Sequence, residues 1–132
     1  MTPSSYDPRR GVGLVRAAIA FAGLAVVLGA FGAHALEERL DERGKELWQT
    51  ATFYQFVHAL GGLFVARWLH EGRGFARATA IAFLVGTVIF AGTLYGMALG
   101  GPRWLGAITP IGGSAYIAGW VFAFIAAGRP AR

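Results

Sequence analysis

Four long tracts without a charged side chain constrain this chain more than any other feature of its sequence. Residues 17–36, 47–66, 78–102 and 104–128 contain no Asp, Glu, Lys or Arg, and each tract has at least 20 residues. A helix of about 20 residues spans the roughly 30 Å hydrocarbon layer of a bilayer. A soluble four-helix protein would need a polar face on each helix, and these tracts lack one. We therefore predict an all-α membrane protein, an antiparallel bundle of four transmembrane helices.

The basic residues are distributed unevenly over the segments outside the tracts. Eight of the twelve Lys and Arg residues lie in the N-terminal region, in the connection at 67–77 and in the C-terminal tail, and four lie in the other two connections. Cytoplasmic segments of membrane proteins carry the excess of basic residues, so we expect both termini in the cytoplasm. The net charge is +5, and the distribution of the charged residues fits this membrane topology. We therefore predict no nucleic-acid partner.

The first tract also has features of a secretory signal peptide, which is the alternative to a first transmembrane helix. Arg9 and Arg10 precede an apolar run that ends in "AHA" at residues 33–35. The run has about 17 residues, which is long for a signal core, and cleavage would leave an odd number of helices. We expect the segment to remain, and a mature N-terminus at Leu36 in intact-mass spectrometry would contradict this.

Proline, glycine and charged residues place the boundaries of the elements. Residues 1–11 hold two prolines and no periodicity, so we expect an unstructured tail there. Thr109 suits the N-cap of the last helix, and Pro110 suits its first position, where a missing N–H is tolerated. We expect a membrane domain over 12–128, with helices at about 12–36, 45–70, 75–99 and 109–127, and a tail at 129–132.

Small residues recur at spacings of three and four along the predicted helices. Helices in lipid associate through close packing at such residues, because lipid tails are as apolar as leucine. Short connections make sequential helices antiparallel neighbours. The glycines expected at helix contacts are Gly29, Gly32, Gly92, Gly96, Gly112 and Gly119.

Polar side chains within the tracts gather in the half of the bundle expected to lie away from the cytoplasm. Polar groups in hydrocarbon face the bundle interior or a hydrated cavity, which makes them functional candidates. His34 is expected near the outer boundary, and His58 about 15 Å deep. We predict a polar or ligand-binding cluster of His34, Tyr54, Gln55, His58, Tyr95, Thr109 and Ser114.

Both histidines of the tracts have two interpretations. His34 either caps the C-terminal end of its helix, held by Glu37 and Glu38, or belongs to a site. His58 either is a neutral core histidine that bonds Tyr95, Gln55 or a backbone carbonyl, or handles a ligand or a proton.

No catalytic residue, metal or cofactor is predicted. The chain has no cysteine, and no tract contains a carboxylate. The two histidines differ in depth by about 10 Å, whereas metal ligands lie about 2 Å from their ion. Ser114 follows two glycines but lacks the nucleophile-elbow pattern and a third triad member. An intramembrane enzyme is therefore disfavoured.

Several motifs resemble a known family. They are "GAFGAHAL" at 29–36, a pattern from Trp48 to Leu60 that includes Tyr54, Gln55 and His58, "FAGTLY" at 90–95, and "ITPIGGSAYIAGW" at 108–120. In this order they resemble the YgdD-like family of small bacterial inner-membrane proteins, a domain of unknown function with mitochondrial transmembrane relatives. The resemblance covers about residues 12–125. It implies a multi-pass protein of the bacterial inner membrane without a cleaved signal, and it brings no established activity.

Two functional hypotheses follow. The first is a non-enzymatic scaffold or interaction protein in the lipid bilayer, whose polar cluster joins the helices and whose smooth faces bind a second copy or another membrane protein. The second is a transporter or channel for a small solute or protons, with an outward-facing vestibule around His58. Two points speak against the second: the cytoplasmic half, where Thr79 and Thr87 are the main polar residues, offers no polar continuation, and four helices leave little lumen.

Overall fold

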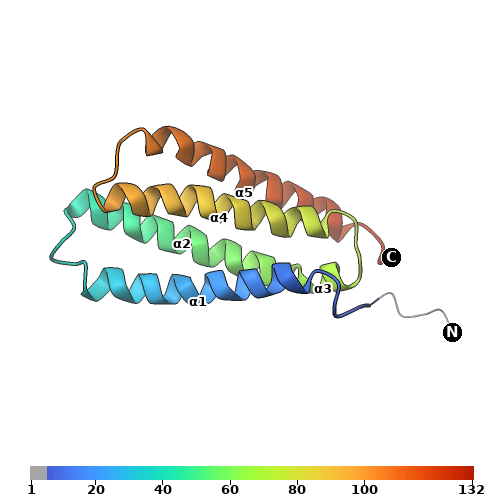
Figure 1. The fold of residues 1–132 in the computed structure, drawn as a ribbon. Helices are drawn as coiled ribbons and strands as arrows, with labels where there is room; N and C mark the ends of the chain where they lie inside the picture. Colours follow the sequence, from blue (N-terminus) through green and yellow to red (C-terminus); the bar gives the residue numbers. More distant parts are fainter. Residues whose placement is uncertain (1–5) are drawn as a thin grey trace.

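The computed structural model describes residues 6–132. Within this range all regular secondary structure is helical, and there is no strand. Four helices have 23 residues each and one has five. The helices are α1 (Val12–His34), α2 (Glu42–Phe64), α3 (Ala66–His70), α4 (Ala76–Ala98) and α5 (Leu105–Ala127) (Figure 1).

The four long helices lie side by side in the order α1, α2, α4, α5, each antiparallel to the one before (Figure 1). Extensive contacts join α1 to α2, α2 to α4, and α4 to α5. The two described ends of the chain lie at the same end of the helices (Figure 1). The short helix α3 lies at this end too. The connections at 35–41 and 99–104 lie at the opposite end, which we call the loop end.

Three helices are long and apolar enough to cross a membrane: α1, α4 and α5. The fourth long helix, α2, has the length but not the apolar composition. Its sequence includes Gln49, Thr52, Gln55 and His58 in addition to charged residues in its first turn. The chain is thus an all-helical protein with three candidate spans, and the expectation of four spans is met only in part.

The last helix begins earlier than the sequence predicts. Thr109 is not its N-cap, since α5 begins at Leu105 and contains Pro110. Bonds between residues three apart form the first turn, from the Leu105 N–H to the Pro102 carbonyl and from the Gly106 N–H to the Arg103 carbonyl. Pro110 cannot donate to the Gly106 carbonyl, but membrane helices tolerate such interior prolines. Residues 105–108 therefore form the first turn of α5.

The second helix also begins earlier, at Glu42 instead of Lys45. The Asp41 carboxylate accepts a 2.7 Å hydrogen bond from the Gly44 N–H, which caps the helix and draws the charged residues into its first turn. At the other end, the helix expected to reach residue 70 is interrupted at Val65, where φ is −86° and ψ is 1°. Hydrogen bonds from Val65 to Gly61 and from Leu69 to Val65 bridge the break.

The N-terminal tail differs from expectation over residues 6–11; residues 1–5 lie outside the described chain. The Asp7 N–H donates to the His70 carbonyl at 2.9 Å, and the Tyr6 ring meets the His70 ring at 5.5 Å. His70 Nδ1 lies 2.8 Å from the Arg10 carbonyl. Backbone and ring contacts with α3 therefore hold this segment, and sequence periodicity could not register them.

Glycines allow the closest helix approaches. A Cβ on Gly112 would meet the Phe90 backbone, and one on Gly119 would lie 2.6 Å from the Phe83 ring, so α4 and α5 pack at van der Waals distance. Gly96 lies against Leu105 in the same way, at 3.1 Å.

Between α1 and α2, Gly29 lies against Thr52 and Gly32 against Trp48. Gly92 differs from its five predicted companions. It is exposed, and a Cβ there would meet nothing within 4 Å, because the α4 face that carries it has no neighbouring helix.

Candidate functional site

A hydrogen-bonded group of side chains joins three helices near the middle of the fold. The Tyr95 hydroxyl on α4 donates to Gln55 Oε1 on α2 at 2.8 Å and lies 3.2 Å from Thr52 Oγ1. Gln55 Nε2 donates to the Phe21 carbonyl on α1 at 2.9 Å. Gln55 is only 3% exposed. We call Thr52, Gln55 and Tyr95 the glutamine group; it fastens α2 to both of its neighbours.

A second group surrounds His58, one turn further along α2. Its Nδ1 lies 2.7 Å from the Tyr54 carbonyl, and the Trp120 Nε1–H of α5 donates to its Nε2 at 3.1 Å. The imidazole stacks on the Tyr116 ring with centroids 3.5 Å apart. The Tyr116 hydroxyl in turn lies 3.1 Å from Thr87 Oγ1 on α4. This histidine group joins α2, α4 and α5.

The two bonds of His58 determine its protonation. Nδ1 must carry a hydrogen to donate to the Tyr54 carbonyl, and Nε2 must keep its lone pair to accept from Trp120. The ring is therefore the neutral Nδ1–H tautomer. A second proton on Nε2 would set two N–H groups against each other, so the Trp120 bond is lost when the ring is charged.

Two further bonds complete the links between helices. Thr93 Oγ1 on α4 and Thr109 Oγ1 on α5 lie 2.7 Å apart. The Trp48 Nε1–H on α2 donates to the Leu28 carbonyl on α1 at 2.8 Å. Trp48 is only 5% exposed and packs between helices.

The predicted cluster divides, and two of its members, His34 and Ser114, stay apart, whereas Tyr54 belongs to the surroundings of His58. His34 ends α1 and is exposed, without a hydrogen bond or ion pair to any residue in 6–132, so Glu37 and Glu38 do not hold it. Ser114 is exposed and donates to the Pro110 carbonyl of its own helix. Tyr54 contributes its ring to Phe90 and Tyr116 but no hydroxyl bond.

Sequence reasoning missed several members of these groups. Thr52 and Trp48 lie one and two turns before Gln55 on the same α2 face, so helical periodicity could have included them. Nothing in the sequence singled out the partners of His58 on the other helices. They are Tyr116, which stacks on its ring, and Trp120, which donates to it.

Hydrogen bonds satisfy the buried polar atoms of both groups. Among residues 6–132, no buried side-chain nitrogen or oxygen lacks a hydrogen-bond partner. The same residues contain no group of three His, Asp or Glu side chains that could hold a metal ion. A groove of about 630 Å³ lies between α1 and α2, and Thr52 is the one residue of the two groups that lines it. A hollow of about 1010 Å³ at the loop end is lined by no residue of either group.

An ionic cluster occupies the other end of the fold. Glu71 follows α3 and accepts 2.7 Å hydrogen bonds from Arg73 Nε and Arg67 Nε. These bonds, that from Arg73 first, hold the pKa of the Glu71 carboxyl below its ordinary value. The Arg73 guanidinium also lies 3.3 Å from the Arg129 carbonyl, and the Arg132 N–H donates to the Glu71 carbonyl. The cluster thus fastens the C-terminal tail to the connection between α3 and α4.

Comparison with known proteins shows the family of this chain. Residues 28–113, which include the whole glutamine group and, of the histidine group, His58 and Thr87, match the family described as protein of unknown function (DUF423). The chain belongs to this family. The match covers α2 and α4 and extends from the later part of α1 into α5.

Curated relatives in bacteria and yeast are described as membrane proteins. A UPF0382 membrane protein of Staphylococcus epidermidis is 44% identical over 105 residues, which is 78% of this chain and 84% of the relative. The UPF0382 membrane protein YwdK of Bacillus subtilis is 41% identical over 106 residues, 79% and 86%. One from Schizosaccharomyces pombe is 38% identical over 103 residues, 74% and 86%. No solved structure matches the chain.

Proposed function

We propose that this member of the DUF423 family is a non-enzymatic membrane protein whose two hydrogen-bonded groups hold four transmembrane helices together for binding a second copy or another membrane protein. The observation that supports this best is that each buried side-chain polar atom among residues 6–132 already has a partner. A catalytic or transport site needs groups free to meet a substrate. Satisfied networks instead give a single conformation.

We infer that α2 is the fourth span despite its lower hydropathy. Two polar side chains near the middle of the helix point inward, since Gln55 and His58 are 3% and 4% exposed. Gln49 and Thr50 are exposed, but they lie closer to the first turn. Phe53, Leu60 and Phe64 lie exposed on the same helix, which suits contact with lipid.

The proposed topology has both termini in the cytoplasm of a bacterial cell, with the protein in its inner membrane. The basic residues support it, since eight of the twelve lie at the end that holds the termini and α3, or next to it. The loop end then faces away from the cytoplasm.

Single cysteines test the topology directly because the chain has none of its own. Glu38→Cys and Ala131→Cys lie at opposite ends of the fold. In intact spheroplasts, a membrane-impermeant maleimide should label the variant at position 38 at once and the variant at position 131 only after permeabilisation. The reverse pattern would invert the topology, and labelling of both variants in intact spheroplasts would contradict the three proposed crossings between these positions, by α2, α4 and α5.

In-cell crosslinking of the full chain tests the binding role. A photoreactive residue in place of Phe124, which is 85% exposed on α5, should give one discrete protein adduct that reappears between preparations. An adduct of twice the chain's mass identifies a second copy. Crosslinks to lipid alone, from this and other exposed positions on α5, would contradict the proposal.

A further inference from the structure

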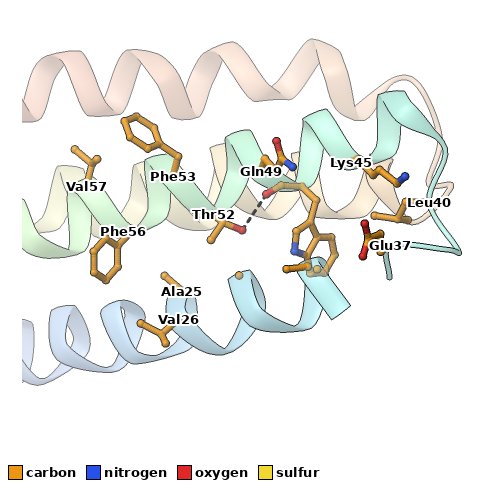
Figure 2. A pocket seen from close by; sticks show the side chains of 14 residues that line it. Ala25, Val26, Glu37, Leu40, Lys45, Gln49, Thr52, Phe53, Phe56 and Val57 are labelled. Carbon is orange, nitrogen blue, oxygen red and sulfur yellow. Dashed lines mark hydrogen bonds between the residues drawn. The ribbon is translucent and has the colours of Figure 1, made fainter. Parts of the chain in front are cut away.

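A groove runs between α1 and α2, and its lining residues all come from these two helices and the connection between them (Figure 2). Gly29, Gly32 and Ala25 of α1 and Thr52 of α2 line it, and their small side chains leave the space. Val26 and Phe53, which are 61% and 63% exposed, also line it. The volume of about 630 Å³ lies within the range of about 300–1,000 Å³ that small-molecule sites occupy.

The length of the groove matches one leaflet of a bilayer. Its α2 lining extends from Lys45 to Val57, which is about 18 Å of helix. One leaflet of a hydrocarbon layer of about 30 Å is about 15 Å thick. A transmembrane helix of a partner would need a groove about twice as long, so the length favours an acyl chain over a helix.

Charged groups line only one end of the groove. Figure 2 shows Glu37 and Lys45 at the loop end, with Gln49 close by, while Thr52 and apolar side chains line the rest. Glu37 makes no ion pair within residues 6–132, and Lys45 makes only an exposed one, 3.1 Å from Glu42. This end offers one anion, one cation and one amide. A headgroup that carries both a phosphate and an ammonium complements this set of charges.

We propose that the groove is a binding site for one phospholipid with an amine headgroup, such as phosphatidylethanolamine. An acyl chain lies along Ala25, Gly29 and Phe56, the phosphate accepts hydrogen bonds from Lys45, and the ammonium faces Glu37. The site rests on the proposed crossing of the membrane by α1 and α2, but it does not depend on which side the termini occupy.

Native mass spectrometry of the full chain tests occupancy of the groove. The protein is released from nanodiscs that contain equal amounts of phosphatidylethanolamine and phosphatidylglycerol. Val26→Trp fills the groove, whereas Val27→Trp places the same side chain on a neighbouring, equally exposed position that does not line it. One retained phosphatidylethanolamine is expected on the wild type and on Val27→Trp, and its loss is expected on Val26→Trp. Equal retention by the two variants would overturn the site.

Headgroup selection is tested with Glu37→Gln and its neighbour Glu38→Gln. Glu38 is exposed and does not line the groove. The first variant should lose the preference for phosphatidylethanolamine and retain the two lipids equally, and the second should keep the wild-type preference. Retention of phosphatidylglycerol over phosphatidylethanolamine by the wild type, or an unchanged preference in Glu37→Gln, would overturn the assigned headgroup.

Failure here differs from failure of the proposed function. If cysteine labelling shows four spans but no lipid is retained, the site is wrong and the topology stands. If labelling contradicts four spans while Val26→Trp alone loses its lipid, the site stands and the proposed function must change.

Discussion

At the scale of single residues, one hydroxyl links α4 to α2 and, through Gln55, to α1. Tyr95→Phe removes the bonds to Gln55 and Thr52 while keeping the ring. Side-chain hydrogen bonds between membrane helices contribute about 0.6 kcal/mol on average, so we expect a loss of this order in unfolding free energy. Steric-trap or denaturant unfolding in micelles measures it. Tyr54→Phe is the matched control, since its hydroxyl makes no bond within residues 6–132; an equal loss there would contradict the assignment.

The His58 side chain links α2 to α5 and should contribute to stability. His58→Leu removes the acceptor for the Trp120 N–H and the stacking on Tyr116. We expect insertion to persist and stability to fall by about 1 kcal/mol, within the range for such interactions in membranes. Thermal melting followed by size-exclusion chromatography measures this, with His34→Leu as the control because His34 is exposed and unpaired in residues 6–132. A larger effect at His34 would return that residue to the candidate site.

Helical periodicity explains which polar residues could be predicted. Gln55 and His58 lie three apart on α2, so the sequence alone puts them on one face, and the structure has both buried. Their partners depend on how far each neighbouring helix is rotated and displaced, which apolar tracts do not encode. Tyr116 and Trp120 were therefore not predicted, and His34 and Ser114 were wrongly grouped with residues that they do not touch.

At the scale of elements, two glycines distinguish a packed face from an open one. Gly112→Ala places a methyl group against the Phe90 backbone and must separate α4 from α5, at a cost of about 2 kcal/mol. Gly92→Ala meets open space, so it is expected to be neutral or to stabilise by up to about 1 kcal/mol through helix propensity. Melting temperatures of the two variants measure the contrast, and equal destabilisation would contradict the arrangement of α4.

The ionic cluster after α3 predicts a pH dependence. The folded pKa of Glu71 lies below its ordinary value of 4.5, so its bonds to Arg73 and Arg67 stabilise the fold above that pH and lose their effect as the pH falls through the folded pKa. Glu71→Gln should therefore melt below the wild type at pH 7 and approach it in acid. Glu38→Gln should match the wild type at both values. A difference for Glu71→Gln that persists unchanged at pH 3 would contradict this origin.

Charge-free tracts predicted the existence of the long helices well and their ends less well. The length of a tract reflects the thickness of the hydrocarbon layer that a helix crosses. Each of the four tracts overlaps one of the four 23-residue helices. The ends of the helices depend on local hydrogen bonds. The Asp41 cap extends α2 toward the N-terminus, and bonds to the Pro102 and Arg103 carbonyls start α5 five residues before Pro110. Helix rules for soluble proteins overestimated the power of proline to start a helix.

At the scale of the whole molecule, the hydrogen-bonded groups lie where a transport path would have to pass. His58 is neutral, bonded at both ring nitrogens and stacked on Tyr116. A proton relay through it would break the Trp120 bond at each cycle. The groove between α1 and α2 reaches the glutamine group only at Thr52, and neither it nor the loop-end hollow is lined by a residue of the histidine group.

We therefore expect proteoliposomes to show no flux above that of empty vesicles. Proton flux is measured with an internal pH-sensitive dye under an imposed potential, and a small-solute assay by vesicle swelling accompanies it. Wild type and His58→Ala should give the same background, with a known channel reconstituted in parallel to show that the vesicles report flux. Flux through the wild type that His58→Ala removes would make the histidine group a conducting site and would replace binding by transport as the function of this fold.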